Sequence, residues 1–139
     1  MLRRIDDRVC VAGQILPEDM GTLKEGGVTM IVNNRPDGEE PGQPLAAEVE
    51  AAAREAGLDY RHIPVAGGLS QGQVQAMAEA LDAADGQIVA FCKSGTRSTY
   101  LWALARAEAG DPPEQLMQKA VQAGYDLTPI YRYLSSPRT

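Results

Sequence analysis

Short apolar runs alternate along this chain with longer segments of helical composition, and this alternation is the strongest constraint on its fold. Four runs have the length and apolar character of strands: residues 9–12, 28–32, 60–65 and 87–91. Strands that alternate with helices are typical of βαβ units and a parallel sheet. The sequence therefore predicts an α/β fold with a mostly parallel central sheet of about four strands, flanked by helices.

Helix start and stop signals fill the stretches between these runs. Ser70 and Gln73 form a capping box, and Gly57 is placed to end a helix. Asp111 is expected to cap a later helix that has proline and glutamate in its first turn. The expected helices cover residues 17–25, 45–56, 70–84, 98–109 and 111–124, with a short one from about residue 128. No repeat or linker interrupts the 139 residues, so we expect one domain over residues 1–139.

The composition excludes several classes of function. Thirteen basic and 19 acidic residues give a formal net charge of −6, whereas nucleic-acid binders usually carry a basic stripe. No apolar run approaches the ~20 residues that span a membrane. The first residues contain arginines without the apolar stretch of a signal peptide, so we expect a cytoplasmic protein. One histidine and two distant cysteines do not make an ordinary zinc site, and we expect neither metal nor cofactor.

The segment Cys92–Ser98 lies between the predicted strand 87–91 and the following predicted helix. Ligands of open α/β sheets bind beyond the carboxyl ends of the strands. A strand–loop–helix joint there directs backbone N–H groups and the positive end of the helix dipole into one cavity. Gly95 permits the turn that this geometry needs. A cysteine in such a place has a lowered pKa and can act as a nucleophile.

We therefore expect Cys92 to be the nucleophile of a small cysteine-dependent enzyme. Arg97 presents a planar fork to an oxyanion, and the Ser98 hydroxyl can donate to the Cys92 sulfur. The other residues expected to cradle the anion are Lys93, Ser94, Gly95 and Thr96. A cysteine after a strand can also be only a small buried apolar residue. That interpretation suits Cys10, which lies between two valines within a predicted strand.

The loop Cys92-Lys93-Ser94-Gly95-Thr96-Arg97-Ser98 resembles the active loop of rhodanese sulfurtransferases, which typically reads Cys-Arg-Ser-Gly-x-Arg-Ser. From about Val11 to Tyr131, however, the chain resembles the family called DUF442, the phosphatase-like domain of beta-lactamase-hydrolase-like proteins. The segments that carry this resemblance are Gly13–Ile15, Asn33–Glu39, Pro41–Pro44, Ile63–Val65, the Cys92 loop and Leu101–Leu104. The resemblance implies a protein-tyrosine-phosphatase-like or dual-specificity-phosphatase-like fold. Members are described as phosphatases or sulfur transferases, and some are fused to or encoded with persulfide dioxygenases.

Two departures from tyrosine and dual-specificity phosphatases bear on the reaction. Those enzymes carry His-Cys-x5-Arg, whereas this chain has Phe91 before the cysteine and a Cys-x4-Arg spacing. Their general acid is an aspartate that would fall here at residues 66–68, which are Ala-Gly-Gly. Phosphoester cleavage needs such a proton donor for the leaving oxygen, whereas sulfur transfer expels a good leaving group. Asp37 is a substitute acid candidate, although aspartate between Pro36 and Gly38 is also a common turn residue.

The polar loop 33–44 is the best candidate for a lid over the site. Arg35 within it can attract an anionic substrate or pair with Asp37, Glu39 or Glu40. Gln14, after the first predicted strand, is placed to reach the rim of the pocket. His62, the single histidine, is expected to serve structure rather than act as a base.

The loop length and the missing carboxylate favour a rhodanese-like sulfurtransferase that forms a persulfide on Cys92. The alternatives are a cysteine-dependent phosphatase and a non-catalytic module that binds anions or persulfides. The expected partner is a small anionic substrate, either a sulfane-sulfur donor or a phosphate ester. The resemblance adds a persulfide dioxygenase as a possible protein partner, with neither nucleic acid nor membrane expected.

Overall fold

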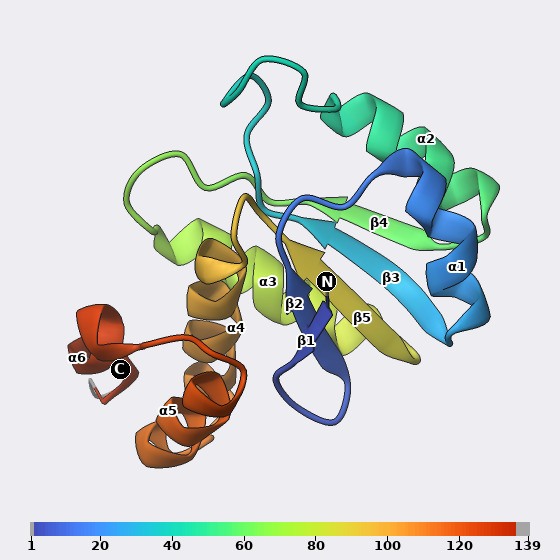
Figure 1. Ribbon diagram of the computed structural model, residues 1–139. Helices are drawn as coiled ribbons and strands as arrows, with labels where there is room; N and C mark the ends of the chain where they lie inside the picture. Colours follow the sequence, from blue (N-terminus) through green and yellow to red (C-terminus); the bar gives the residue numbers. More distant parts are fainter. Residues whose placement is uncertain (1, 136–139) are drawn as a thin grey trace.

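A computed structural model describes residues 2–135 of the chain. Its five-stranded sheet has the order β1-β2-β5-β3-β4 (Figure 1). The strands are β1 (Leu2–Arg4), β2 (Val9–Ala12), β3 (Val28–Asn33), β4 (Asp59–His62) and β5 (Gln87–Phe91). Strands β2, β5, β3 and β4 are parallel, and β1 pairs antiparallel with β2 at the edge. The prediction of a mostly parallel α/β sheet is therefore confirmed.

Helices cover both faces of this sheet. They are α1 (Met20–Glu25), α2 (Ala46–Glu55), α3 (Gln71–Ala83), α4 (Thr96–Glu108), α5 (Pro113–Gln122) and α6 (Tyr131–Leu134). Short 3-10 helices precede α1 and α6, at Pro17–Asp19 and Thr128–Ile130. The sheet therefore forms the middle layer of the fold.

Alternate residues along the strands supply two separate apolar cores. Ile88 and Ala90 of β5 belong to the core that α3, α4 and α5 complete, together with Trp102. Val89 and Phe91 of the same strand belong to the core under α1 and α2. Because successive side chains of a strand point to opposite faces, a strand buried on both faces must be apolar throughout. This requirement explains why the apolar runs of the sequence predicted the central strands.

The parallel register brings the carboxyl ends of three neighbouring strands to one level. Ala12 of β2 is paired with Phe91 of β5, and Phe91 with Asn33 of β3. The chain segments that follow remain hydrogen-bonded: the Cys92 N–H donates to the Ala12 carbonyl at 3.2 Å, and the Asn34 N–H to the Phe91 carbonyl at 2.8 Å. Cys92 therefore lies in the middle of this edge.

Three details differ from the sequence-based expectations. Strand β1 was not predicted, because its three residues are exposed and include Arg3 and Arg4. Strand β4 ends at His62 rather than Val65. Asp111 was wrongly expected to cap α5: the capping position is Pro112, and the Asp111 carboxylate instead pairs with Arg106 at 2.9 Å. Within the part of the chain that the structure describes, no helix is long and apolar enough to cross a membrane.

The capping box at the start of α3 is confirmed and can be tested directly. Ser70 Oγ accepts from the Gln73 N–H at 3.2 Å, and Gln73 Oε1 accepts from the Ser70 N–H at 2.8 Å. We expect Ser70→Ala to lower the free energy of unfolding by about 1 kcal/mol, because an N–H at the helix start loses its partner. Urea denaturation measures this change. The control is Gln75→Ala on the exposed face of α3, and equal stability of the two variants would contradict the prediction.

Candidate active site

Cys92 follows β5 directly and is fully buried, with 0% of its surface exposed. The backbone N–H of Gly95 donates to its Sγ at 3.1 Å. Burial raises the pKa of the Cys92 thiol, but hydrogen bonds from surrounding backbone N–H groups outweigh this effect, and the net pKa is lowered. These donors are the N–H groups of Ser98, Ser94, Arg97 and Gly95. The backbone N–H groups of the loop therefore lower the pKa of the Cys92 thiol, which is the direction that the sequence predicts.

Two glycines allow the loop to close this tightly. Gly95 has φ +94° and lies directly before α4, so its left-handed backbone turns the chain from the loop into the helix. A Cβ atom on Gly13, after β2, would lie 2.8 Å from the Lys93 carbonyl oxygen. Side chains at either position would displace the loop, so the glycines are part of the site's construction.

Arg97, in the first turn of α4, joins the Cys92 loop to two other segments. Its Nη1 and Nη2 donate to both carboxylate oxygens of Glu39, at 2.6 and 3.0 Å. Nη1 also donates to the Val65 carbonyl at 2.8 Å. The hydrogen bonds to Glu39 are the main cause of a raised pKa of Arg97, and the neighbouring Cys92 adds to it. Arg97 thus presents a fixed positive charge next to the Cys92 sulfur.

The 34–45 loop connects β3 to α2 and is held together by Arg35. This side chain, only 3% exposed, donates to Glu39 at 2.8 Å, to Glu40 at 2.7 Å and to Gln14 Oε1 at 2.9 Å. Of the two roles considered for Arg35, ion pairing is the one that these contacts support, with Glu39 and Glu40 as partners. Gln14 reaches the loop through this same contact.

Glu39 and Glu40 tie the 34–45 loop to the Cys92 loop. The pKa of Glu39 is lowered to about 2, mainly by Arg97 and then by Arg35. Glu40 has a lowered pKa because of Arg35 and lies 3.5 Å from the Lys93 ammonium group. Both carboxylates are therefore charged at neutral pH, and neither is suited to donate a proton.

Asp37 lies in a turn of the 34–45 loop, and its Oδ1 accepts from the Ala46 N–H at 2.7 Å. Ala46 is the first residue of α2, so Asp37 satisfies one of the donors that a helix start leaves open. The turn interpretation of Asp37 is confirmed. Its role as a general acid stays a prediction.

Asn34 is a buried site residue that the sequence did not single out. Its Oδ1 accepts from the Ser98 hydroxyl at 2.8 Å, and its Nδ2 donates to the Ile63 carbonyl at 3.0 Å. The Ser98 hydroxyl is therefore directed at Asn34 and not at the Cys92 sulfur, which receives the backbone N–H of Ser98 instead. The sequence feature that could have indicated Asn34 is the pair Asn33-Asn34, which directly follows the apolar run 28–32.

The remaining candidates have mainly structural contacts. The hydroxyls of Ser94 and Thr96 lie 3.0 Å apart. His62 Nε2 lies 3.1 Å from the Arg35 carbonyl, which supports the structural role expected for this side chain. Cys10 is buried within β2, and burial raises the pKa of its thiol, as expected of a core residue.

A cleft of about 540 Å³ opens on the far side of Arg97, between the 65–71 segment, α4 and the chain end around α6. Its walls are mostly apolar and include two tyrosines. The lining side chains are Val65, Leu69, Val74, Arg97, Tyr100, Leu104, Ile130 and Tyr133, with Gln71 and Glu108 among the polar ones. No three His, Cys, Asp or Glu side chains in residues 2–135 gather so as to hold a metal ion.

The chain is similar in sequence and in fold to known proteins. Over 133 residues the chain is 37% identical to a beta-lactamase hydrolase-like protein of Agrobacterium fabrum, covering 94% of this chain but only 31% of that protein. A crystal structure of a candidate phosphatase from Neisseria meningitidis is 27% identical and superposes with a TM-score of 0.82, covering 96% of this chain and 95% of the other.

A more distant structure is that of kinase associated phosphatase, which is 16% identical and superposes with a TM-score of 0.76 over 96% of this chain and 90% of the other. This likeness shows the shared phosphatase-type fold. Residues 1–109 match the family described as beta-lactamase hydrolase-like protein, phosphatase-like domain. The chain therefore belongs to this family of phosphatase-like domains.

Proposed function

We propose that this protein is a cysteine-dependent phosphatase that hydrolyses a phosphate monoester through Cys92. The observation that carries the proposal is the buried sulfur, surrounded by backbone N–H groups and next to the Arg97 guanidinium. The family match and the likeness to the Neisseria meningitidis candidate phosphatase support phosphate as the anion. They favour the phosphatase over the sulfurtransferase that the loop length first suggested.

The reaction would proceed in two steps. The phosphate oxygens bind to the loop N–H groups and Arg97, and the Cys92 thiolate attacks phosphorus. The S–P bond forms as the P–O bond to the leaving group breaks, and the leaving oxygen takes up a proton from a general acid. Water then attacks the phosphocysteine and gives a proton to the conjugate base of the general acid, so that the S–P bond breaks, inorganic phosphate is released and the thiolate returns.

Asp37 is our candidate for the acid, because the other two carboxylates of its loop are held as anions by arginine. Its hydrogen bond to Ala46 fixes the turn that carries it. We place the organic part of the ester in the cleft beyond Arg97, since apolar walls with a few polar groups are typical of small-molecule sites.

We expect Cys92→Ser to abolish release of phosphate from aryl phosphates, because a serine hydroxyl in this loop is not ionised at neutral pH. The matched control is Cys10→Ala, which removes the other thiol from the core and should leave turnover near the wild-type rate. Phosphate release from both variants and wild type measures the effect. Unchanged turnover by Cys92→Ser would contradict the proposal.

The same assay separates the competing functions. The Cys-x4-Arg spacing and the absence of a carboxylate at residues 66–68 favour sulfur transfer as the second candidate. That function predicts sulfite release from thiosulfate and a sulfur adduct of about 32 daltons on wild type, without phosphate release. Tight anion binding without either turnover would indicate the non-catalytic module.

We expect Asp37→Asn to slow alkyl phosphate hydrolysis by on the order of 100-fold, because a poor leaving group needs a proton. Hydrolysis of p-nitrophenyl phosphate, whose leaving group is stable as an anion, should change little. The amide oxygen of asparagine can still accept from Ala46, so the turn is kept. Asp82→Asn, at an exposed site on α3, is the control. Equal rates of alkyl ester hydrolysis in wild type and Asp37→Asn would exclude Asp37 as the acid.

A further inference from the structure

The peptide group between Ser94 and Gly95 is hydrogen-bonded at both of its ends. On the inner side, the Gly95 N–H donates to Cys92 Sγ at 3.1 Å. On the outer side, the Ser94 carbonyl accepts from the Tyr125 hydroxyl at 2.9 Å. Because a peptide group is planar and rigid, the two bonds cannot change independently. The contact to Tyr125 therefore restrains the direction of an N–H group that stabilises the thiolate.

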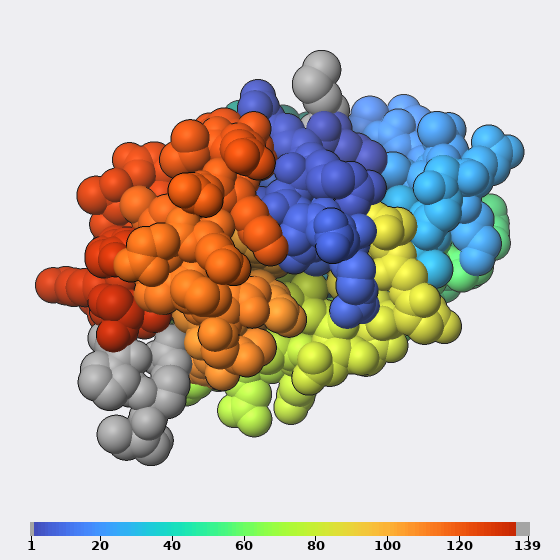
Figure 2. All heavy atoms as spheres, turned by 90° about the horizontal axis from the view of Figure 1, so that it is seen from below, coloured from blue at the N-terminus to red at the C-terminus, as the bar shows by residue number. Residues whose placement is uncertain are grey.

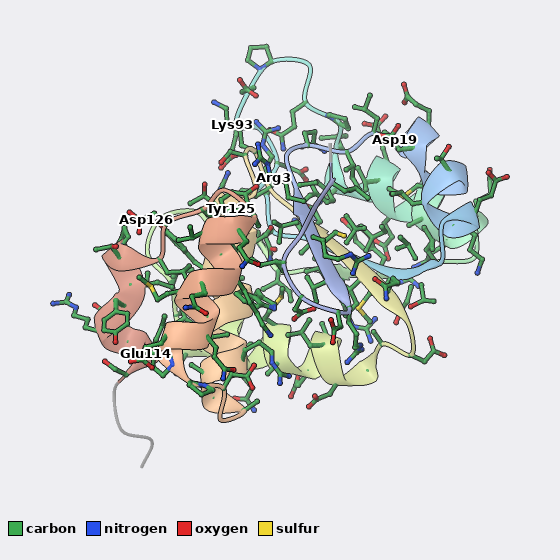
Figure 3. The ribbon with its side chains drawn as sticks, turned by 60° about the horizontal axis from the view of Figure 1, so that its bottom comes forward. Arg3, Asp19, Lys93, Glu114, Tyr125 and Asp126 are labelled. Atoms are coloured by element: carbon green, nitrogen blue, oxygen red, sulfur yellow. The ribbon has the colours of Figure 1, made fainter. Side chains whose placement is uncertain are left out.

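Tyr125 is itself held in place from two sides. It lies in the connection between α5 and the last helical segment, and its N–H donates to the Ala120 carbonyl at 2.8 Å. The Arg3 guanidinium lies 5.8 Å from the centre of its ring and donates to the Ala123 carbonyl at 3.0 Å. Figure 2 shows the N-terminal segment packed against the α5 region, and Figure 3 places Arg3 and Tyr125 beside the loop that carries Lys93.

The Tyr125 ring packs directly against Gly95 of the Cys92 loop. A Cβ atom on Gly95 would collide with the Tyr125 hydroxyl. Residue 95 is therefore limited to glycine by its positive φ and by the tyrosine that lies against it. Such close contact allows the hydroxyl to act on this one peptide group.

We propose that Tyr125 is a positioning residue for the nucleophile, which keeps the Ser94–Gly95 peptide group oriented with its N–H toward the Cys92 sulfur. A hydrogen bond to the carbonyl also polarises the same peptide group and strengthens its N–H as a donor. This inference rests on Cys92 as the nucleophile of the proposed function. It concerns the reactivity of the thiol and not the identity of the substrate.

The hydroxyl can fill this role only while it is protonated. Burial raises the pKa of Tyr125; Arg3 opposes this effect, and the Cys92 thiolate adds to it, so the net pKa lies above the ordinary value. The charged groups that face the thiol and the tyrosine are the guanidinium groups of Arg97 and Arg3. Guanidinium groups are not deprotonated in proteins. A change in the titration of Cys92 therefore reports on the loop itself.

The test is the rate of alkylation of Cys92 by iodoacetamide as a function of pH in wild type and Tyr125→Phe. Phenylalanine keeps the ring against Gly95 and Arg3 and removes only the hydroxyl. Mass spectrometry of the Cys92 peptide separates this thiol from Cys10. We expect alkylation of the variant to be about two- to tenfold slower below the thiol pKa, as loss of one hydrogen bond implies. The two rates should converge at alkaline pH.

Tyr131→Phe is the matched control, because the hydroxyl of Tyr131, the first residue of α6, donates to Glu114 of α5 at 3.3 Å, apart from the Cys92 loop. It should keep the wild-type alkylation profile. A Tyr125→Phe profile identical to wild type would overturn the inference. A uniform slowing of alkylation at all pH values would also overturn it. So would a loss of stability in urea without any shift in the midpoint of the alkylation pH profile, since either result indicates a merely structural role.

The alkylation assay also separates this inference from the proposed function. If wild type releases no phosphate but the midpoint still moves upward in Tyr125→Phe, the phosphatase proposal fails and the role of Tyr125 stands. If wild type releases phosphate but the midpoint of the alkylation pH profile does not move in Tyr125→Phe, the phosphatase proposal stands and the role of Tyr125 fails.

Discussion

The burial of the Cys92 sulfur among backbone N–H donors is the constraint on which the rest of this site depends. Burying a charge without partners is costly, and here the partners are backbone N–H groups rather than another side chain alone. The backbone can supply several donors to one atom only if the chain turns sharply, which Gly95 permits, and only if the following helix begins at once, as α4 does. The positive end of that helix then favours the same charge.

Burial of the Arg35 guanidinium in the 34–45 loop imposes a second electrostatic requirement. A guanidinium that is 3% exposed needs hydrogen-bond acceptors, and Glu39, Glu40 and Gln14 provide them from three directions. Because Glu39 also binds Arg97, the buried Arg35 and the arginine beside Cys92 share one carboxylate. The loop and the site are therefore parts of a single charge network, and substitutions in one will change the other.

The sequence predicted the parts of this molecule that depend on local pattern. Central strands must be apolar on both faces, and the Cys92 loop contains its cysteine, glycine and arginine within a few residues. Strand β1 has no such pattern because it is an exposed edge. The contacts of Asn34 and Tyr125 were not predicted for a different reason. Asn34 contacts Ser98, 64 residues away in sequence, and Tyr125 contacts Ser94, 31 residues away, so no local pattern indicates either contact. At Asp111 a local pattern led to a wrong prediction: the pattern is typical of a helix cap, but the carboxylate forms an ion pair with Arg106.

The level ends of β2, β5 and β3 give the site a floor, and the segments around it form its walls. The floor is Cys92 and its neighbours, which the sheet hydrogen bonds from Ala12 and Phe91 hold in register. The walls are the peptide groups after Cys92 and the 34–45 loop, which hydrogen bonds and partly exposed ion pairs secure. A substitution in the 34–45 loop will therefore change the walls around Cys92, while the sheet hydrogen bonds keep the sulfur at the same height relative to the strand ends.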